Sequence, residues 1–234
     1  MSQVHEARLA ELDSLKALAL VMMLVSNFVS DLNFFKIMVV SEGDPWWYLS
    51  RITASLFVGI SGISYYLANR NNSDFNRVLI RTRKLIFWAF VITAVTFFFQ
   101  PKAYIRFGVL HLLAFASIVA FPLVKKPFFA LLVGLSLFFL PLSSSSISVW
   151  FGLRETGFHA VDYFPLNPWL GLFFVSMALA KYIYPEGKSL TKFEWPEQWL
   201  WLGRNTLMIY VFHQPFLIGT MLLTGIIGFD QVLD

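Results

Sequence analysis

Long apolar stretches alternate along the chain with short segments that are rich in proline and charged residues. Each stretch approaches the length of about 20 mostly apolar residues that a helix needs to cross a bilayer. The pattern predicts about seven spans, at residues 10–31, 48–69, 80–99, 106–123, 127–142, 166–184 and 199–227. Because these spans and their connections fill the chain, we expect one all-α domain over residues 1–234, a polytopic integral membrane helix bundle.

The composition agrees with a membrane protein. Hydrophobic residues make up 57% of the chain and charged residues 14%, whereas soluble domains are about 45–50% apolar and about 25% charged. The 26 phenylalanines and 8 tryptophans supply bulk suited to lipid contact and interfacial anchoring. The first apolar segment lacks the short core and cleavage site of a signal peptide, so we expect it in the mature protein. The absence of cysteine excludes disulfides and cysteine-ligated metals.

Lysine and arginine gather in alternate connections, at residues 70–84, 125–126 and 181–204, and are sparser in the connections between these. The positive-inside rule then places the N-terminus in the cytoplasm and the C-terminus outside. A net charge of +4 would also suit nucleic acid. Basic loops in a membrane protein record its topology, however, so no nucleic-acid partner is expected.

Polar side chains interrupt the apolar spans at a few positions. Lys16 and Asn27 stand eleven residues apart in the first span, which is about 16 Å and close to three full turns, so both project from nearly one face. His111 lies near the outer end of the fourth span and His213 near the middle of the last. Ionisable groups at such depths are costly and usually line a functional cavity. Pro215 removes a backbone donor in the last span and predicts a kink or a break.

Other features have both a structural and a functional interpretation. Lysines and arginines near span ends can simply extend to lipid headgroups. Gly59 and Gly62 form a small-residue face suited to close helix packing. In the predicted outer loop before the sixth span, His159, Asp162 and Tyr163 could contact a substrate, or Asp162 could only cap that span. The sequence has no glycine-rich phosphate loop, zinc-protease motif or nucleophile elbow, and we expect no metal.

Four blocks of the sequence resemble one known family. They are RLAELDSLKALALVMMLVSNFVSDL at 8–32, RFGVLHLLA at 106–114, VDYFPLNPWLGLF at 161–173 and LGRNTLMIYVFHQPFL at 202–217. The first resembles the first helix of the transmembrane acyltransferase superfamily. Together they resemble the catalytic-domain family of heparan-alpha-glucosaminide N-acetyltransferase, in particular its small prokaryotic members. The cell membrane of a prokaryote is therefore the expected location.

The resemblance implies an acyl-CoA-dependent enzyme. Relatives take an acyl group, here in the first place acetyl from acetyl-CoA, on the cytoplasmic side and pass it to an amine or hydroxyl of a sugar on the far side. Lys16 takes the place of the family's arginine near the donor, and Asn27 takes the place of its far-side histidine. The CoA phosphates would be held by a cytoplasmic set of cations: Lys16, Arg81, Arg83, Lys84 and Arg204.

The resemblance leaves the general base open, because Asn27 cannot take up a proton and would instead orient or polarise the acyl carbonyl. We place His111 first as the base, His213 second and Asp31 third, with His159 and the acids Glu42 and Asp44 as further candidates. The acceptor would contact Asp162, Tyr163 and His159.

A second interpretation belongs to another class of protein. A non-enzymatic transporter or flippase-like protein could move an acylated or anionic molecule along the same polar path. The amide at Asn27, in place of the family's histidine, favours this alternative. A homodimer is compatible with a membrane bundle, although nothing in the sequence encodes one.

Overall fold

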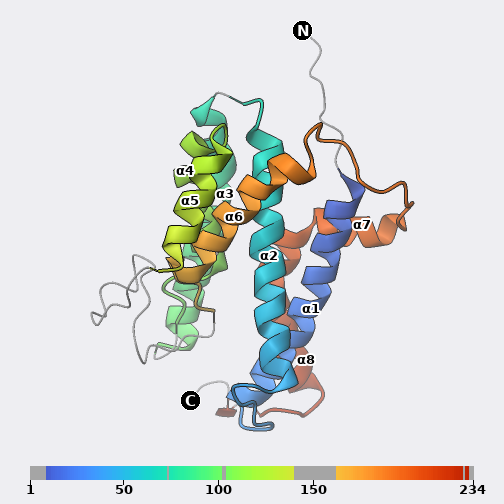
Figure 1. Ribbon diagram of the computed structural model, residues 1–234. Helices are drawn as coiled ribbons and strands as arrows, with labels where there is room; N and C mark the ends of the chain where they lie inside the picture. Colours follow the sequence, from blue (N-terminus) through green and yellow to red (C-terminus); the bar gives the residue numbers. More distant parts are fainter. Residues whose placement is uncertain (1–8, 73, 102–103, 140–161, 229, 232–234) are drawn as a thin grey trace. The chain divides into compact units, whose positions relative to one another are not determined.

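The computed structural model describes residues 9–72, 74–101, 104–139, 162–228 and 230–231 (Figure 1). Every regular element in these residues is helical, which confirms the all-α prediction. The elements are α1 (Ala10–Phe34), α2 (Pro45–Asn69), α3 (Phe75–Phe99), α4 (Val109–Val119), the 3₁₀ turn η1 (Phe121–Leu123), α5 (Pro127–Leu137), α6 (Leu166–Ile183), α7 (Glu197–Arg204) and α8 (Thr206–Leu223).

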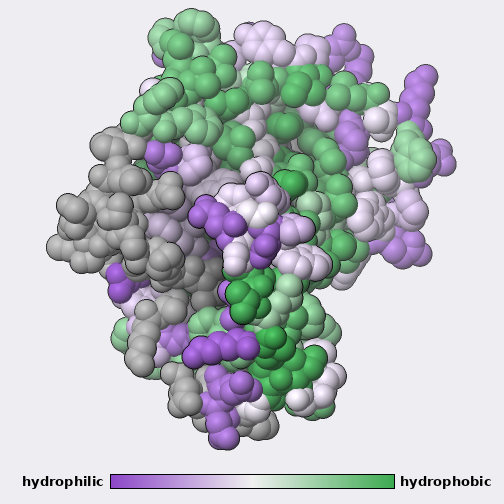
Figure 2. Space-filling model, turned by 60° about the horizontal axis from the view of Figure 1, so that its bottom comes forward, coloured by the Kyte–Doolittle hydropathy of each residue, from purple (hydrophilic) through white to green (hydrophobic). Residues whose placement is uncertain are grey.

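Four of these helices are long and apolar enough to cross a membrane, namely α1, α2, α6 and α8. The predicted spans at 106–123 and 127–142 correspond to α4 and α5, which are apolar but only 11 residues long each. α3 covers the predicted span at 80–99, and its Phe90 and Phe98 are 73% and 80% exposed. Figure 2 shows further hydrophobic areas on the surface, as expected of a chain in contact with lipid. The helices therefore indicate an integral, multi-pass membrane protein.

The predicted last span, 199–227, is in fact two helices. α7 ends at Arg204 and α8 begins at Thr206, and between them Asn205 has φ −106° and ψ 18°. The Asn205 side chain donates to the carbonyl of Trp201 at 2.9 Å and so satisfies the end of α7. Pro215 lies inside α8, which continues through it, because a spanning helix tolerates proline where its surroundings satisfy the freed carbonyl. Of the two predicted outcomes, a kink or a break at Pro215, the break is therefore wrong, and the helix break lies at Asn205.

The chain divides into two compact units, of which unit 1 consists of Met1–Phe57 and Lys188–Asp234. Its main helices, α1 and α8, lie side by side and run in the same direction (Figure 1). Their contacts show this register, since Asp13 pairs with Arg204 and Asn27 with His213. Near the C-terminal ends of both helices, Phe35 and Met221 share an apolar cluster. The parallel direction agrees with a first and a last span that cross the membrane with the same polarity.

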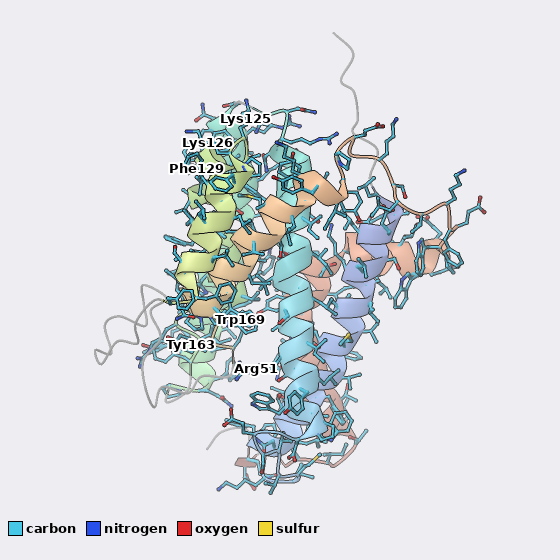
Figure 3. The ribbon with its side chains drawn as sticks, viewed as in Figure 1. Arg51, Lys125, Lys126, Phe129, Tyr163 and Trp169 are labelled. Carbon is cyan, nitrogen blue, oxygen red and sulfur yellow. The ribbon has the colours of Figure 1, made fainter. Side chains whose placement is uncertain are left out.

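Unit 2 consists of Val58–Gly187, and small residues allow its helices to approach closely. A Cβ placed on Gly62 of α2 would lie 2.4 Å from the carbonyl oxygen of Phe173 in α6, so only glycine fits there. The predicted small-residue face is thereby confirmed. Figure 3 shows Lys125 and Lys126 at one end of this unit and Tyr163 toward the other. That separation agrees with the predicted assignment of these residues to opposite faces of the membrane.

Candidate functional site

A charged cluster joins the beginning of α1 to α7. Asp13 is buried, with its side chain 3% exposed, and lies 3.6 Å from Lys16 Nζ and 3.5 Å from Arg204 Nε. Arg204 also reaches the exposed Glu197, whose Oε1 is 2.5 Å from Nη1. The structure thus brings together Lys16 and Arg204, both predicted to bind the donor. We call Asp13, Lys16, Glu197 and Arg204 the charged cluster.

Close helix packing holds this cluster in place. A Cβ on Gly203 would lie 1.8 Å from the carbonyl oxygen of Asp13, so the backbone of α7 rests directly on the backbone of α1. Trp199 donates its indole N–H to Ser14 Oγ at 2.8 Å and fixes the other end of α7. Arg204 follows Gly203 in the sequence. The close contact between the backbones of α7 and α1 therefore places the Arg204 side chain beside Asp13.

A second polar cluster lies farther along α1, where Asn27 Nδ2 is 2.6 Å from His213 Nε2. His213 is buried, and its Nδ1 contacts the carbonyl oxygen of Tyr210. A carbonyl can only accept, so Nδ1 carries the proton and donates it. Nε2 then holds a lone pair and accepts from the Asn27 amide. This arrangement makes His213 a neutral imidazole whose basic nitrogen faces Asn27.

Asp31 and Gln214 form a second link between α1 and α8. Gln214 Nε2 donates to Asp31 Oδ1 at 2.5 Å, and Asp31 is only 5% exposed. Asp31 lies four residues after Asn27 and Gln214 directly after His213, so the two pairs occupy neighbouring turns. We call Asn27, Asp31, His213 and Gln214 the amide–histidine cluster.

One face of α1 carries both clusters. Lys16 and Asn27, eleven residues apart, both lie on the side that meets α7 and α8. At 1.5 Å per residue they are about 16 Å apart along the helix axis. Ala17 and Leu20, buried between them, are apolar. The predicted common face of Lys16 and Asn27 is therefore confirmed, while their depths in the membrane stay a prediction.

His111, in unit 2, has both ring nitrogens engaged. The hydroxyl of Thr93 donates to the carbonyl of Ile105 at 2.7 Å, so its oxygen accepts from His111 Nε2 at 3.2 Å. The other nitrogen, Nδ1, accepts from the backbone N–H of Gly108 at 3.2 Å. His111 thereby caps the N-terminus of α4, in the manner of a capping box.

Asp162 contributes to the same helix end. Its Oδ2 accepts from the backbone N–H of Val109 at 3.3 Å, in the first turn of α4. This hydrogen bond links Asp162 to α4, whereas the sequence suggested that Asp162 could cap the following span. Tyr163 beside it is partly buried, and His159 lies outside the described residues.

The remaining predicted donor-binding cations belong to α3 in unit 2. Arg81, Arg83 and Lys84 are all exposed there. No group of three or more histidine, aspartate or glutamate side chains that could hold a metal ion occurs among the described residues.

Sequence reasoning missed three members of these clusters. Asp13 and Glu197 are charged residues near span ends and Gln214 is a polar residue beside a histidine, and none of the three was a predicted site residue. The spacing of Asp13 and Lys16, three residues apart on one helix, was a usable signal. Gln214 and Asp31 are 183 residues apart, and no local pattern links them.

A comparison with protein families gives one match over most of the chain. The family model for heparan-alpha-glucosaminide N-acetyltransferase, catalytic, covers residues 8–215. This range includes both clusters. Neither the curated proteins nor the solved structures provide a match. The chain belongs to the family of the heparan-alpha-glucosaminide N-acetyltransferase catalytic domain.

Proposed function

We propose that the protein is a membrane acyltransferase that moves an acyl group, in the first place acetyl, from cytoplasmic acyl-CoA to an amine or hydroxyl of a sugar-type acceptor on the outer side. The observation that carries the proposal is the pair of polar clusters on one face of α1, about 16 Å apart. One cluster offers cations and the other offers a neutral base beside an amide. The family, whose members are N-acetyltransferases, supports the same reaction.

The charged cluster suits the phosphates of the donor. Lys16 and Arg204 are 28% and 33% exposed, so their charged heads are accessible, while buried Asp13 holds both in position. Glu197, which is 73% exposed, forms an ion pair with the Arg204 guanidinium. A CoA phosphate would displace this carboxylate and form charge-assisted hydrogen bonds with the guanidinium. Exposed Arg81, Arg83 and Lys84 are further candidates for phosphate contacts.

The amide–histidine cluster suits the transfer step. An amide nitrogen carries two hydrogens, and Asn27 uses one of them on His213 Nε2. The second can donate to the carbonyl oxygen of the acyl thioester and stabilise the negative charge that develops there. The long, slim pantetheine arm would lie along the apolar stretch that begins at Ala17 and Leu20.

Proton transfer then falls to His213. The acceptor replaces Asn27 at Nε2 and gives up its proton to this nitrogen as its own nitrogen or oxygen attacks the carbonyl carbon. The carbon–sulfur bond breaks, and CoA leaves as the thiolate, which takes up the proton released from His213 Nε2 and so restores the neutral imidazole. His111 is less suited to this role, because backbone and Thr93 occupy both of its nitrogens. We therefore favour His213 over His111 as the base.

Acetyl transfer from acetyl-CoA to glucosamine by purified protein tests the proposal. We expect CoA release and N-acetylated product, both lost in His213→Gln. The transporter alternative predicts that sugar or acyl-CoA moves across a vesicle membrane without any covalent product. A protein that neither binds acetyl-CoA nor forms product would contradict the proposal.

A further inference from the structure

Asp31 is a buried carboxylate in which only one of the two oxygens accepts a hydrogen bond from the described residues. It is 5% exposed, and its Oδ1 accepts from Gln214. Its Oδ2 is buried too and has no hydrogen-bond partner in the part of the chain that the structure describes. Leaving a buried acceptor without a donor costs free energy, and more so for a charged group in a membrane-spanning helix. This buried oxygen is therefore suited to accept a hydrogen bond from a bound molecule.

The charges around Asp31 define what that donor can be. His213 is neutral in the arrangement described above, and Asn27 and Gln214 carry no charge. Within the amide–histidine cluster, Asp31 is therefore the single ionic group. A carboxylate oxygen can only accept, so its partner must offer an N–H or O–H group.

The position of Asp31 relates this oxygen to the proposed transfer step. Asp31 and Asn27 are four residues apart on α1, and both face α8. Side chains with this spacing have Cβ atoms about 5–6 Å apart. A single sugar-sized acceptor can therefore reach Asp31 with one polar group while another lies at Asn27 and His213.

We propose that Asp31 is a specificity-determining residue, whose Oδ2 binds an N–H or O–H donor of the acceptor beside the group that is acylated. Gln214 holds the carboxylate in position by occupying Oδ1. This inference rests on the proposed function. It gives Asp31 a role in binding the acceptor, while His213 takes the proton.

Calorimetric binding of glucosamine and of glucose to the purified full chain tests the inference without requiring turnover. Asp31→Asn keeps the shape of the side chain and its ability to pair with Gln214, but it removes the charge and one acceptor. We expect it to weaken glucosamine binding by about 10- to 100-fold. The exposed Glu194 provides a matched control, because Glu194→Gln removes a carboxylate charge outside the cluster and should leave binding within twofold.

The comparison of the two sugars distinguishes a hydroxyl from an ammonium group as the hydrogen-bond donor to Asp31. Weaker binding of both sugars in Asp31→Asn would support a contact between Asp31 and a hydroxyl beside the acylated group, whereas weaker binding of glucosamine alone would place the reacting amine itself at Asp31 and overturn the inference. Binding of both sugars within twofold of the unaltered protein would overturn the inference, as would an unaltered protein that binds neither. These results are distinguishable from failure of the proposed function, which acetyl-CoA binding and CoA release report separately.

Kinetic measurements add a readout that a merely structural role would not move. We expect Asp31→Asn to raise the KM for the acceptor at least tenfold and to leave the KM for acetyl-CoA within twofold. If Asp31→Asn does not fold, Gln214→Leu keeps the charge but releases the carboxylate. It should raise the acceptor KM severalfold, and an unchanged acceptor KM in a folded Gln214→Leu protein would contradict the inference.

Discussion

Replacing Gly203 by alanine should separate α7 from α1 and move Arg204 away from Asp13. The new Cβ would lie 1.8 Å from the carbonyl oxygen of Asp13, 2.6 Å from its carbonyl carbon and 3.1 Å from its Cα. All three atoms are backbone atoms of a helix, so no side chain can turn aside to make room. A close carbon–oxygen contact is about 3.3 Å, so α7 must withdraw by about 1.5 Å. Overpacking of this kind costs about 1–3 kcal/mol.

The assay compares Gly203→Ala with Gly219→Ala in detergent. A Cβ on Gly219, inside α8, would meet nothing within 4 Å, so this control tests the effect of the residue change without the overlap. We expect the midpoint of thermal unfolding to fall by several degrees in Gly203→Ala, and to stay or rise in Gly219→Ala because alanine favours a helix. Acetyl-CoA binding should weaken only in Gly203→Ala. Equal stability and equal acetyl-CoA affinity in the two variants would refute the reasoning.

The proposed roles lead to further measurable outcomes. His213→Gln should lower the rate of acetyl transfer by at least about 100-fold in single-turnover kinetics and leave acetyl-CoA binding within twofold in calorimetry. If acetyl-CoA affinity fell as much as the rate, His213 would bind the donor and would not be the base. His111→Leu should lower thermal stability, because leucine cannot accept from the backbone N–H of Gly108 and the cap of α4 is lost, with a smaller loss of transfer than His213→Gln at matched folded protein. Glu197→Gln should tighten acetyl-CoA binding severalfold at low salt, because it removes the carboxylate that competes for Arg204, and added salt should reduce the gain. Acidification should abolish transfer as His213 Nε2 becomes protonated and can no longer accept a proton, and a rate that rises toward acid pH would exclude this histidine as the base.

Local periodicity explains which parts of the site could be predicted from the sequence. The eleven-residue spacing of Lys16 and Asn27 depends only on the geometry of one helix, and the structure confirms their common face. The close approach at Gly62 follows in the same way from small residues within one span. Both predictions needed no knowledge of a partner helix.

Tertiary contacts explain what the sequence could not show. The pairs Asn27–His213 and Asp31–Gln214 join residues 186 and 183 positions apart, so their existence depends on the register of α1 against α8. The break at Asn205 was missed because the apolar pattern runs through it, and Pro215 offered the stronger local signal.

The choice of the general base between His111 and His213 also depends on tertiary contacts. His111 and His213 are both histidines in apolar helices, and the sequence ranks His111 first. The hydrogen bond of His111 to Gly108 is local to the start of α4, but the hydrogen bond to Thr93 depends on how α3 meets α4. Only the fold therefore reveals that His111 has both ring nitrogens engaged while His213 Nε2 faces a side-chain amide.

Acetyl transfer across a sealed membrane tests the central claim most directly. Purified protein in liposomes would receive acetyl-CoA labelled in the acetyl group on one side and glucosamine on the other, with His213→Gln as the inactive control. The account predicts labelled N-acetylglucosamine in the glucosamine compartment, free CoA in the acetyl-CoA compartment, and neither with the variant. Passage of unmodified sugar or intact acetyl-CoA without a labelled product would contradict the account and favour a transporter.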